Sequence, residues 1–99
     1  MIQEEVKMIY AQLLETFERK NEDYGNSFEI SMEKYGLISA LTRISDKFNR
    51  IEHLVINRGS QPNYESLEDS LLDCANYCIM TAAKLRADLD QDKHDKNFI

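Results

Sequence analysis

The chain has few of the residues that interrupt helices, with three glycines and one proline among 99 residues. That scarcity argues against a turn-rich β-sandwich or barrel. Two cysteines are too few to staple a small secreted domain. No apolar run approaches the roughly 18–20 residues of a membrane span, and Glu4 and Glu5 stand where a signal peptide would carry basic and apolar residues. We therefore expect a cytoplasmic protein with reduced thiols.

Basic residues are also scarce. The chain has 12 Lys and Arg but 18 Asp and Glu, which gives a net charge of −6. This balance disfavours general binding to DNA or to anionic membranes, which depends on basic surface. The charge is uneven: residues 37–63 are net +2, whereas residues 1–36 and 64–99 are each net −4. The length fits about one domain, and a chain this short is marginally stable as a lone monomer.

Apolar residues recur at helical spacing in three segments, which predicts an all-α domain of three to four helices. The first helix covers about residues 3–20 and leads into a loop at residues 20–27, where Gly25 or Asn26 is free to take a positive φ. A short helix at residues 28–35 then stops at Gly36. The second long helix, at about residues 37–57, has a bundle seam: Leu37, Leu41, Ile44, Phe48, Ile51 and Val55.

The third long helix covers about residues 64–89, after a break at residues 57–63. Its seam has the same spacing: Leu67, Leu71, Cys74, Cys78, Thr81 and Leu85. Further apolar residues lie outside that seam and predict a second buried face, most simply a dimer interface: Leu72, Ala75, Ile79, Met80, Ala82 and Ala83. Residues 1–89 are thus expected to form one helical bundle completed by dimerisation, and the polar residues 90–99 are expected to fray.

A basic stripe runs along the second long helix. Arg43, Asp46, Arg50 and His53 fall at i, i+3, i+7 and i+10, opposite the apolar seam, with Lys47 at the edge. Guanidinium groups match phosphate oxygens, so the stripe fits a phosphate clamp. It equally fits a solvated face with pairs between its own charges.

An acidic stripe runs along the third long helix, where Glu65, Asp69, Asp73 and Asn76 fall at i, i+4, i+8 and i+11. Carboxylates four residues apart oppose helix stability unless a cation faces them. Oxygen ligands of this kind suit Mg²⁺ with substrate phosphate. The alternatives are a solvated face or salt bridges to the basic stripe.

Three short elements resemble one known family, the nucleotide modification associated domain 1 group of small helical proteins common in phages and prophages. The elements are Lys20–Phe28 (K-x-x-D-Y-G-x-S-F), Arg43–Arg50 (R-x-x-D-K-x-x-R) and Glu65–Tyr77 (E-S-x-x-D-x-x-x-D-x-A-N-Y). The resemblance implies a link to nucleotides. The layout is also similar to the MazG-like all-α NTP pyrophosphatases, which bind Mg²⁺ through E-E-x-x-E and E-x-x-D motifs. This chain departs from those motifs, since Arg43-x-x-Asp46-Lys47 and Asp69-x-x-x-Asp73 stand in their places.

The first functional hypothesis is a nucleotide-handling protein, in its most specific form a Mg²⁺-dependent (d)NTP pyrophosphohydrolase. One Mg²⁺ would be held by Asp46, Glu65, Asp69 and Asp73, and Asp46, Asp69 or Asp73 would activate water. The substrate phosphates would be bound by four cations, namely Lys20, Arg43, Lys47 and Arg50. Tyr24 would stack on the base, and Asn76 would also bind the substrate.

The second hypothesis is a non-catalytic interaction protein, for example a phage factor that binds a host protein or sequesters a nucleotide. In that case the two stripes pair internally, with Asp46, Asp69 and Asp73 facing Arg43, Lys47 and Arg50. A third reading is a structural oligomer that binds no ligand.

Overall fold

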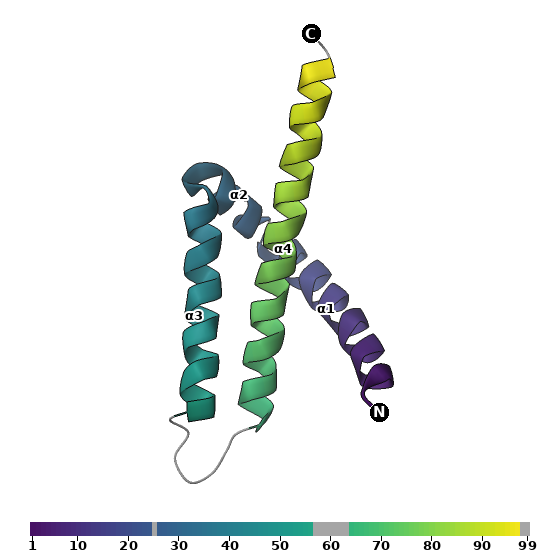
Figure 1. The fold of residues 1–99 in the computed structure, drawn as a ribbon, viewed down its shortest axis with the longest axis vertical. Coiled ribbons are helices and arrows are strands. Elements are labelled where there is room, and N and C mark those ends of the chain that lie inside the picture. Colours follow the sequence, from purple (N-terminus) through teal and green to yellow (C-terminus); the bar gives the residue numbers. More distant parts are fainter. Residues whose placement is uncertain (25, 57–63, 98–99) are drawn as a thin grey trace.

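The computed structural model contains four helices (Figure 1): α1 (Gln3–Tyr24), α2 (Ser27–Tyr35), α3 (Leu37–Ile56) and α4 (Tyr64–Asn97). It describes residues 1–24, 26–56 and 64–97, with side chains described up to residue 91. This part of the chain contains helices and no strand, so the all-α prediction is confirmed. None of its helices is long and apolar enough to cross a membrane.

The first helix is longer than the sequence predicted. It continues to Tyr24 through residues 20–23, which were expected to begin the loop. Those residues include neither glycine nor proline, so nothing stops the helix there. The turn between α1 and α2 has the predicted positive φ, which is 61° at Asn26. Helix α2 ends at Gly36 as predicted, where φ is 74°. Gly25 and the predicted break at residues 57–63 lie outside the described residues.

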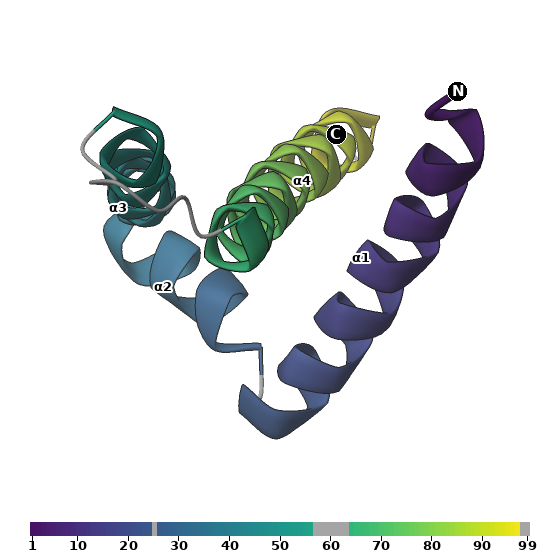
Figure 2. The ribbon, with the colours of Figure 1, turned by 90° about the horizontal axis from the view of Figure 1, so that it is seen from below.

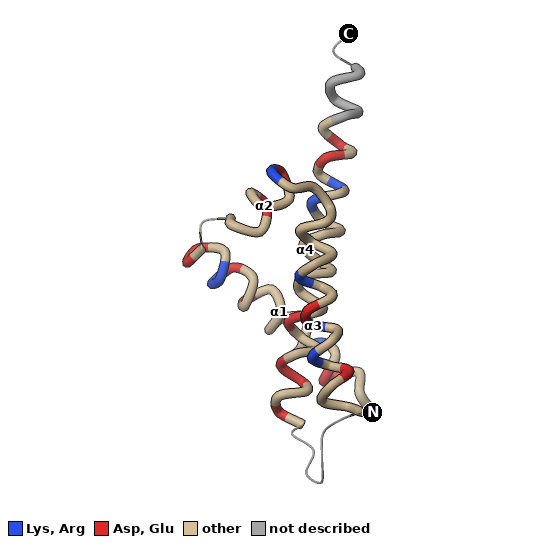
Figure 3. Tube along the Cα trace, turned by 90° about the vertical axis from the view of Figure 1, so that its left-hand side faces the viewer, with Lys and Arg blue, Asp and Glu red and all other residues tan. Residues whose placement is uncertain are grey.

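The last helix also runs past its predicted end at residue 89 and reaches Asn97. Residues 90–97 again contain no glycine or proline. The C-terminal end of α4 projects beyond the other helices (Figures 1 and 3). Fraying of residues 90–99 stays a prediction.

The helices form an open arrangement around α4. Helices α3 and α4 run antiparallel side by side, while α1 lies on another side of α4 and diverges from it toward the N-terminus (Figure 2). Helix α2 bridges α1 and α3 across one end (Figure 2). Among the described residues, the buried apolar side chains are Leu13, Met32 and Ala40. Ala40, near the start of α3, is 1% exposed.

One ion cluster fastens α2 to α4. The Lys84 ammonium lies 3.3 Å from Glu33 and 4.0 Å from Glu29 on α2, and 2.9 Å from Asp88 on its own helix. The hydrogen bond to Asp88 raises the pKa of Lys84, the hydrogen bond to Glu33 adds to that effect, and desolvation opposes it. The charged form of Lys84 therefore helps to hold the short α2 in place.

The predicted seams are buried only in part, because Ile44 and Ile51 on α3 and Leu67, Cys74 and Thr81 on α4 are half-buried while their other members are exposed. Leu41 and Phe48 on α3 are 58% and 56% exposed, and Leu71 on α4 is 48% exposed. The half-buried Lys47 of α3 reaches Asp73 on α4 and so shares the half-buried part of α3 with Ile44 and Ile51.

The second apolar face of α4 is partly covered within the chain. Ile79, Met80 and Ala83 line a groove whose other wall includes Leu13 and Phe17 of α1. Helix α1 thus lies against the face that was expected to meet a second copy.

Candidate functional site

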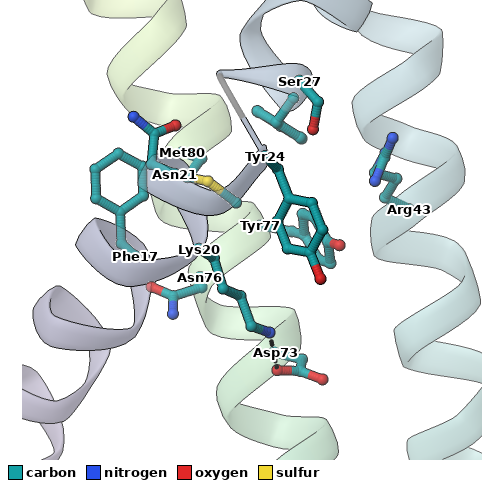
Figure 4. Close-up of a pocket in the computed structure, with 11 residues that line it drawn as sticks. Phe17, Lys20, Asn21, Tyr24, Ser27, Arg43, Asp73, Asn76, Tyr77 and Met80 are labelled. Carbon is teal, nitrogen blue, oxygen red and sulfur yellow. Dashed lines mark ion pairs between the residues drawn. The ribbon is translucent and has the colours of Figure 1, made fainter.

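A pocket of about 300 Å³ opens where α1 ends, α2 begins, and both meet α3 and the middle of α4 (Figure 4). Its lining combines two cations, one carboxylate, two amides and four aromatic rings: Phe17, Lys20, Asn21, Tyr24, Ser27, Phe28, Arg43, Asp73, Asn76, Tyr77 and Met80. Each of the four helices contributes at least one of these residues. The pocket therefore depends on the tertiary arrangement.

An ion triad lies on one wall of the pocket. The Asp73 carboxylate is 3.3 Å from Lys47 Nζ and 3.7 Å from Lys20 Nζ. Lys20 extends from α1 toward Asp73 in Figure 4, and Lys47 approaches it from α3. These three side chains are between 31% and 53% exposed. Solvent can reach the triad, so an anionic ligand could compete with Asp73 for the two ammonium groups.

Aromatic rings form the rest of the wall. The rings of Phe28 and Tyr77 lie 5.7 Å apart with an interplanar angle of 38°, a tilted arrangement that aromatic pairs favour. The Arg43 guanidinium lies 5.9 Å from the centre of the Tyr77 ring, within cation–π distance. Tyr24 lies at the end of α1 and is 68% exposed. Its ring has surface left for a ligand.

Two amides connect the helices around the pocket. Asn76 donates from Nδ2 to the backbone carbonyl of Leu13, at 3.4 Å, which ties α4 to α1. Asn21 donates from Nδ2 to Oδ1 of Asn26 and so bridges the turn between α1 and α2. The turn that carries Tyr24 is thereby held beside the pocket.

The pocket gathers five of the predicted site residues: Lys20, Tyr24, Arg43, Asp73 and Asn76. Lys47 contacts Asp73 directly and so adjoins the same site. The basic stripe was expected on the side of its helix opposite the seam, but Arg43 and Lys47 turn toward α4, where Tyr77 and Asp73 are their partners. Pairing with groups on α4 decides this orientation.

Four predicted site residues lie elsewhere. Arg50 donates from Nε to Oγ of the buried Ser70 at 3.0 Å. Asp46, Glu65 and Asp69 are exposed and do not line this pocket. In the described part of the chain, no three His, Cys, Asp or Glu side chains come close enough together to hold a metal ion. The predicted Mg²⁺ ligands are therefore not assembled in this arrangement.

The internal pairing expected under the interaction-protein hypothesis is present in part. The described residues include the Lys47–Asp73 ion pair, whereas Arg50 binds a serine hydroxyl. Lys20 of α1, which that hypothesis did not include, is the second partner of Asp73.

Sequence reasoning gave no role to several residues of the pocket: Phe17, Asn21, Ser27, Phe28, Tyr77 and Met80. A signal for two of them was available. Asp73, Asn76, Tyr77 and Met80 recur at spacings of three, one and three residues, so they share one face of α4. The position of Phe28 beside Tyr77 depends on the packing of α2 and could not be read from spacing.

The two cysteines of the α4 seam differ in exposure. Cys74 is half-buried, and burial is the main cause that raises the pKa of its thiol. Cys78, one turn later, is exposed. Neither residue lines the pocket.

Comparison with known proteins decides the family. The sequence model described as nucleotide modification associated domain 1 matches residues 20–85, two thirds of the chain. The chain belongs to this family. The matched region begins at Lys20 and contains every residue that lines the pocket except Phe17. No curated protein and no solved structure matches the chain.

Proposed function

We propose that the pocket between the four helices binds a nucleotide. The observation that carries the proposal is the convergence of Lys20, Arg43 and an exposed tyrosine ring on one cavity of about 300 Å³. A nucleotide combines a flat aromatic base with an anionic phosphate, and this lining offers partners for both. The family name, which links the domain to nucleotide modification, agrees with this chemistry.

The base would stack on Tyr24. This ring is 68% exposed, whereas Tyr77 already contacts Phe28 and Arg43. Stacking on an aromatic ring is worth about 1–3 kcal/mol per base and tolerates any base. The nearby amides could add hydrogen bonds to the base edge, since each amide offers both a donor and an acceptor.

The phosphate would bind between the cations. Lys20 and Lys47 already converge on one carboxylate from two different helices, which shows that both ammonium groups reach a common point. A phosphate oxygen can replace a carboxylate oxygen at such a point. Arg43 lines the same pocket and could bind a second oxygen with its planar fork.

Magnesium-dependent hydrolysis remains a prediction from the sequence. Asp73 is the one carboxylate among the residues that line this pocket, and two lysines already neutralise it. This donor set does not fit a Mg²⁺ site, which requires several oxygen ligands. Our proposal is therefore binding, and a pyrophosphohydrolase reaction would require that Asp46, Glu65 and Asp69 approach the pocket.

The test is a thermal-shift panel of (d)NTPs, (d)NMPs and cyclic nucleotides, each measured with EDTA and with Mg²⁺. A ligand at about 100 times its Kd adds about 2.7 kcal/mol, which raises the Tm of a domain this small by about 10–20 °C. Lys20→Gln should reduce the shift strongly. The matched control is Arg19→Gln, the adjacent exposed cation of α1 that does not line the pocket.

The outcomes separate the hypotheses. A shift in EDTA that Lys20→Gln removes and Arg19→Gln retains supports the binding proposal. A shift seen with Mg²⁺ and triphosphates alone favours the pyrophosphohydrolase prediction and identifies the substrate for a turnover assay. A flat panel, or equal effects of the two variants, contradicts the assignment of this pocket.

A second candidate function is an interaction protein that binds another protein and has no catalytic role, in a phage or prophage setting as the resemblance implies. The observation in its favour is the large apolar surface, such as Phe48 and Leu41, which are more than half exposed. A flat nucleotide panel together with a monomeric chain in solution would favour this candidate.

A further inference from the structure

The molecule exposes more surface than a compact chain of its size. Its accessible surface is 8030 Å², whereas a compact monomer of 11.6 kDa exposes about 5,800 Å². Its radius of gyration is 16.6 Å, against about 13 Å for a compact domain of this length. The projecting end of α4 accounts for a share of this difference, and the open arrangement of the helices for the rest.

Much of the extra surface is apolar and lies on the α3–α4 pair. We use the name seam face for its exposed members, which follow the two seams of the sequence: Leu37, Leu41, Phe48 and Val55 on α3, with Leu71, Cys78 and Leu85 on α4. None of these seven residues is charged.

The seam face lies on the side of the α3–α4 pair opposite the pocket. On α3, Arg43 and Lys47 reach Tyr77 and Asp73 of α4, and the buried Ala40 lies roughly 20–60° around the helix from them. At about 100° per residue, Leu41 and Phe48 lie roughly 80–100° from Ala40 in the other direction.

The same relation holds on α4. Ser70 and Tyr77 contact α3, and Asp73 lies on the pocket side. Leu71 and Cys78 lie roughly 80–100° from the contact line in the other direction. The exposed stripes of both helices therefore face the same way and form one continuous surface.

We propose that the seam face binds the seam face of a second copy of this chain, so that two α3–α4 pairs form an antiparallel four-helix bundle. The two stripes share the spacing of bundle helices. A two-fold interface uses the same patch on both copies, and the seam face itself carries no charge, with the exposed Glu52 beside it on α3. The seam face supplies only part of the surface excess of about 2,200 Å² per chain, and an interface of standard size uses about 800 Å² from each partner.

This placement differs from the one expected from the sequence, which assigned the second copy to the other apolar face of α4. It also has a consequence for the pocket, because the two pockets of the dimer point outward on opposite sides. Each pocket is then complete within one chain, so dimerisation and ligand binding are separate properties that can be tested separately.

The test is sedimentation equilibrium of the full chain between about 1 and 100 μM. We expect a dimer for the wild type, and for Leu41→Glu a rise in the dimer dissociation constant of about 100-fold or more, because a two-fold interface contains each new charge twice. The control is Leu14→Glu on α1, since Leu14 is 59% exposed and Leu41 is 58% exposed. Leu14 lines the groove between α1 and α4, so it also reports on the competing apolar surface.

A dimer that Leu41→Glu dissociates and Leu14→Glu retains supports the proposal. A monomeric wild type overturns it, and so does a dimer that only Leu14→Glu dissociates, because the interface would then be the α1 groove. Circular dichroism checks the helicity of each variant. If Leu41→Glu does not fold, Val55→Glu near the end of α3 tests the same face.

Discussion

Asp73 offers the sharpest test of the pocket, because its replacement has opposite expected effects on stability and on ligand binding. Asp73→Asn preserves the shape of the side chain and removes its charge, so it abolishes the ion pairs to Lys20 at 3.7 Å and Lys47 at 3.3 Å. Both pairs are partly exposed, and such pairs are worth about 0.2–1 kcal/mol each. We expect a total loss of about 0.5–2 kcal/mol, or about 2–16 °C in Tm.

The affinity of Asp73→Asn for a nucleotide in the absence of metal should instead be higher than that of the wild type. Without its charge, Asp73 no longer competes for the two lysines and no longer repels a phosphate. Removal of one like charge at this range strengthens binding by about 1–2 kcal/mol, or roughly 5–30-fold. If Asp73 instead helps to hold Mg²⁺, the variant should bind triphosphates more weakly when Mg²⁺ is present.

The assay is thermal unfolding at 50 mM and 1 M NaCl, followed by nucleotide titration in EDTA. The loss of Tm should shrink at 1 M NaCl, where the screening length is about 3 Å. Asp69→Asn is the control, because Asp69 lies one turn earlier on α4, is exposed, and forms no ion pair within the described part of the chain. Equal Tm values for the wild type and Asp73→Asn at low salt, or weaker nucleotide binding in EDTA, would refute the reasoning.

Three further predictions concern packing, pH and thiol reactivity. Ala40→Leu should destabilise the fold by about 1–3 kcal/mol in urea unfolding, since a residue 1% exposed leaves no room for a larger side chain; unchanged stability would mean that the start of α3 is not closely packed. The raised pKa of Lys84 means that its stabilising contribution is complete below the ordinary lysine pKa of about 10.4 and is lost as pH rises through the higher folded value. The Tm of Lys84→Met should therefore fall less than that of the wild type between pH 10 and 11.5, and parallel curves would contradict the role of the ion cluster. At pH 8, in the Leu41→Glu variant that is expected to be monomeric, a maleimide should modify Cys78 faster than Cys74, because Cys78 is exposed in the single chain and burial raises the pKa of Cys74; equal rates by mass spectrometry would argue against this packing of α4.

Local sequence determined the helices and their main boundary. The 4-3-4 spacing of apolar residues specified α3 and α4, and Gly36 ended α2 because its φ of 74° costs glycine little. The same local rules placed the end of α1 too early, at residue 20 instead of Tyr24. Polar residues such as Asn21 and Asp23 favour loops without excluding helix, and contacts of the helix end decided the outcome.

The site was predictable by residue type and only partly by position. Lys20, Arg43 and Asp73 were identified from charge patterning and from the family resemblance. Their convergence joins residues 23 to 53 positions apart in the chain, and no local pattern sets such distances. The acidic stripe also looked uniform in sequence, yet Asp73 lines the pocket and Asp69 does not.

What the sequence by itself determined is therefore the class of fold, the lengths of its apolar stripes and the family to which the chain belongs. Tertiary structure decided which side of each helix packs against a neighbouring helix. A period of 3.6 residues reveals that a helix has an apolar side and a charged side, but either side can face a neighbour when the partner supplies the matching group. Here Asp73 and Tyr77 on α4 draw Lys47 and Arg43 inward, and the α3 seam is divided, since Ile44 and Ile51 are half-buried beside these cations while the bulky Leu41 and Phe48 remain exposed.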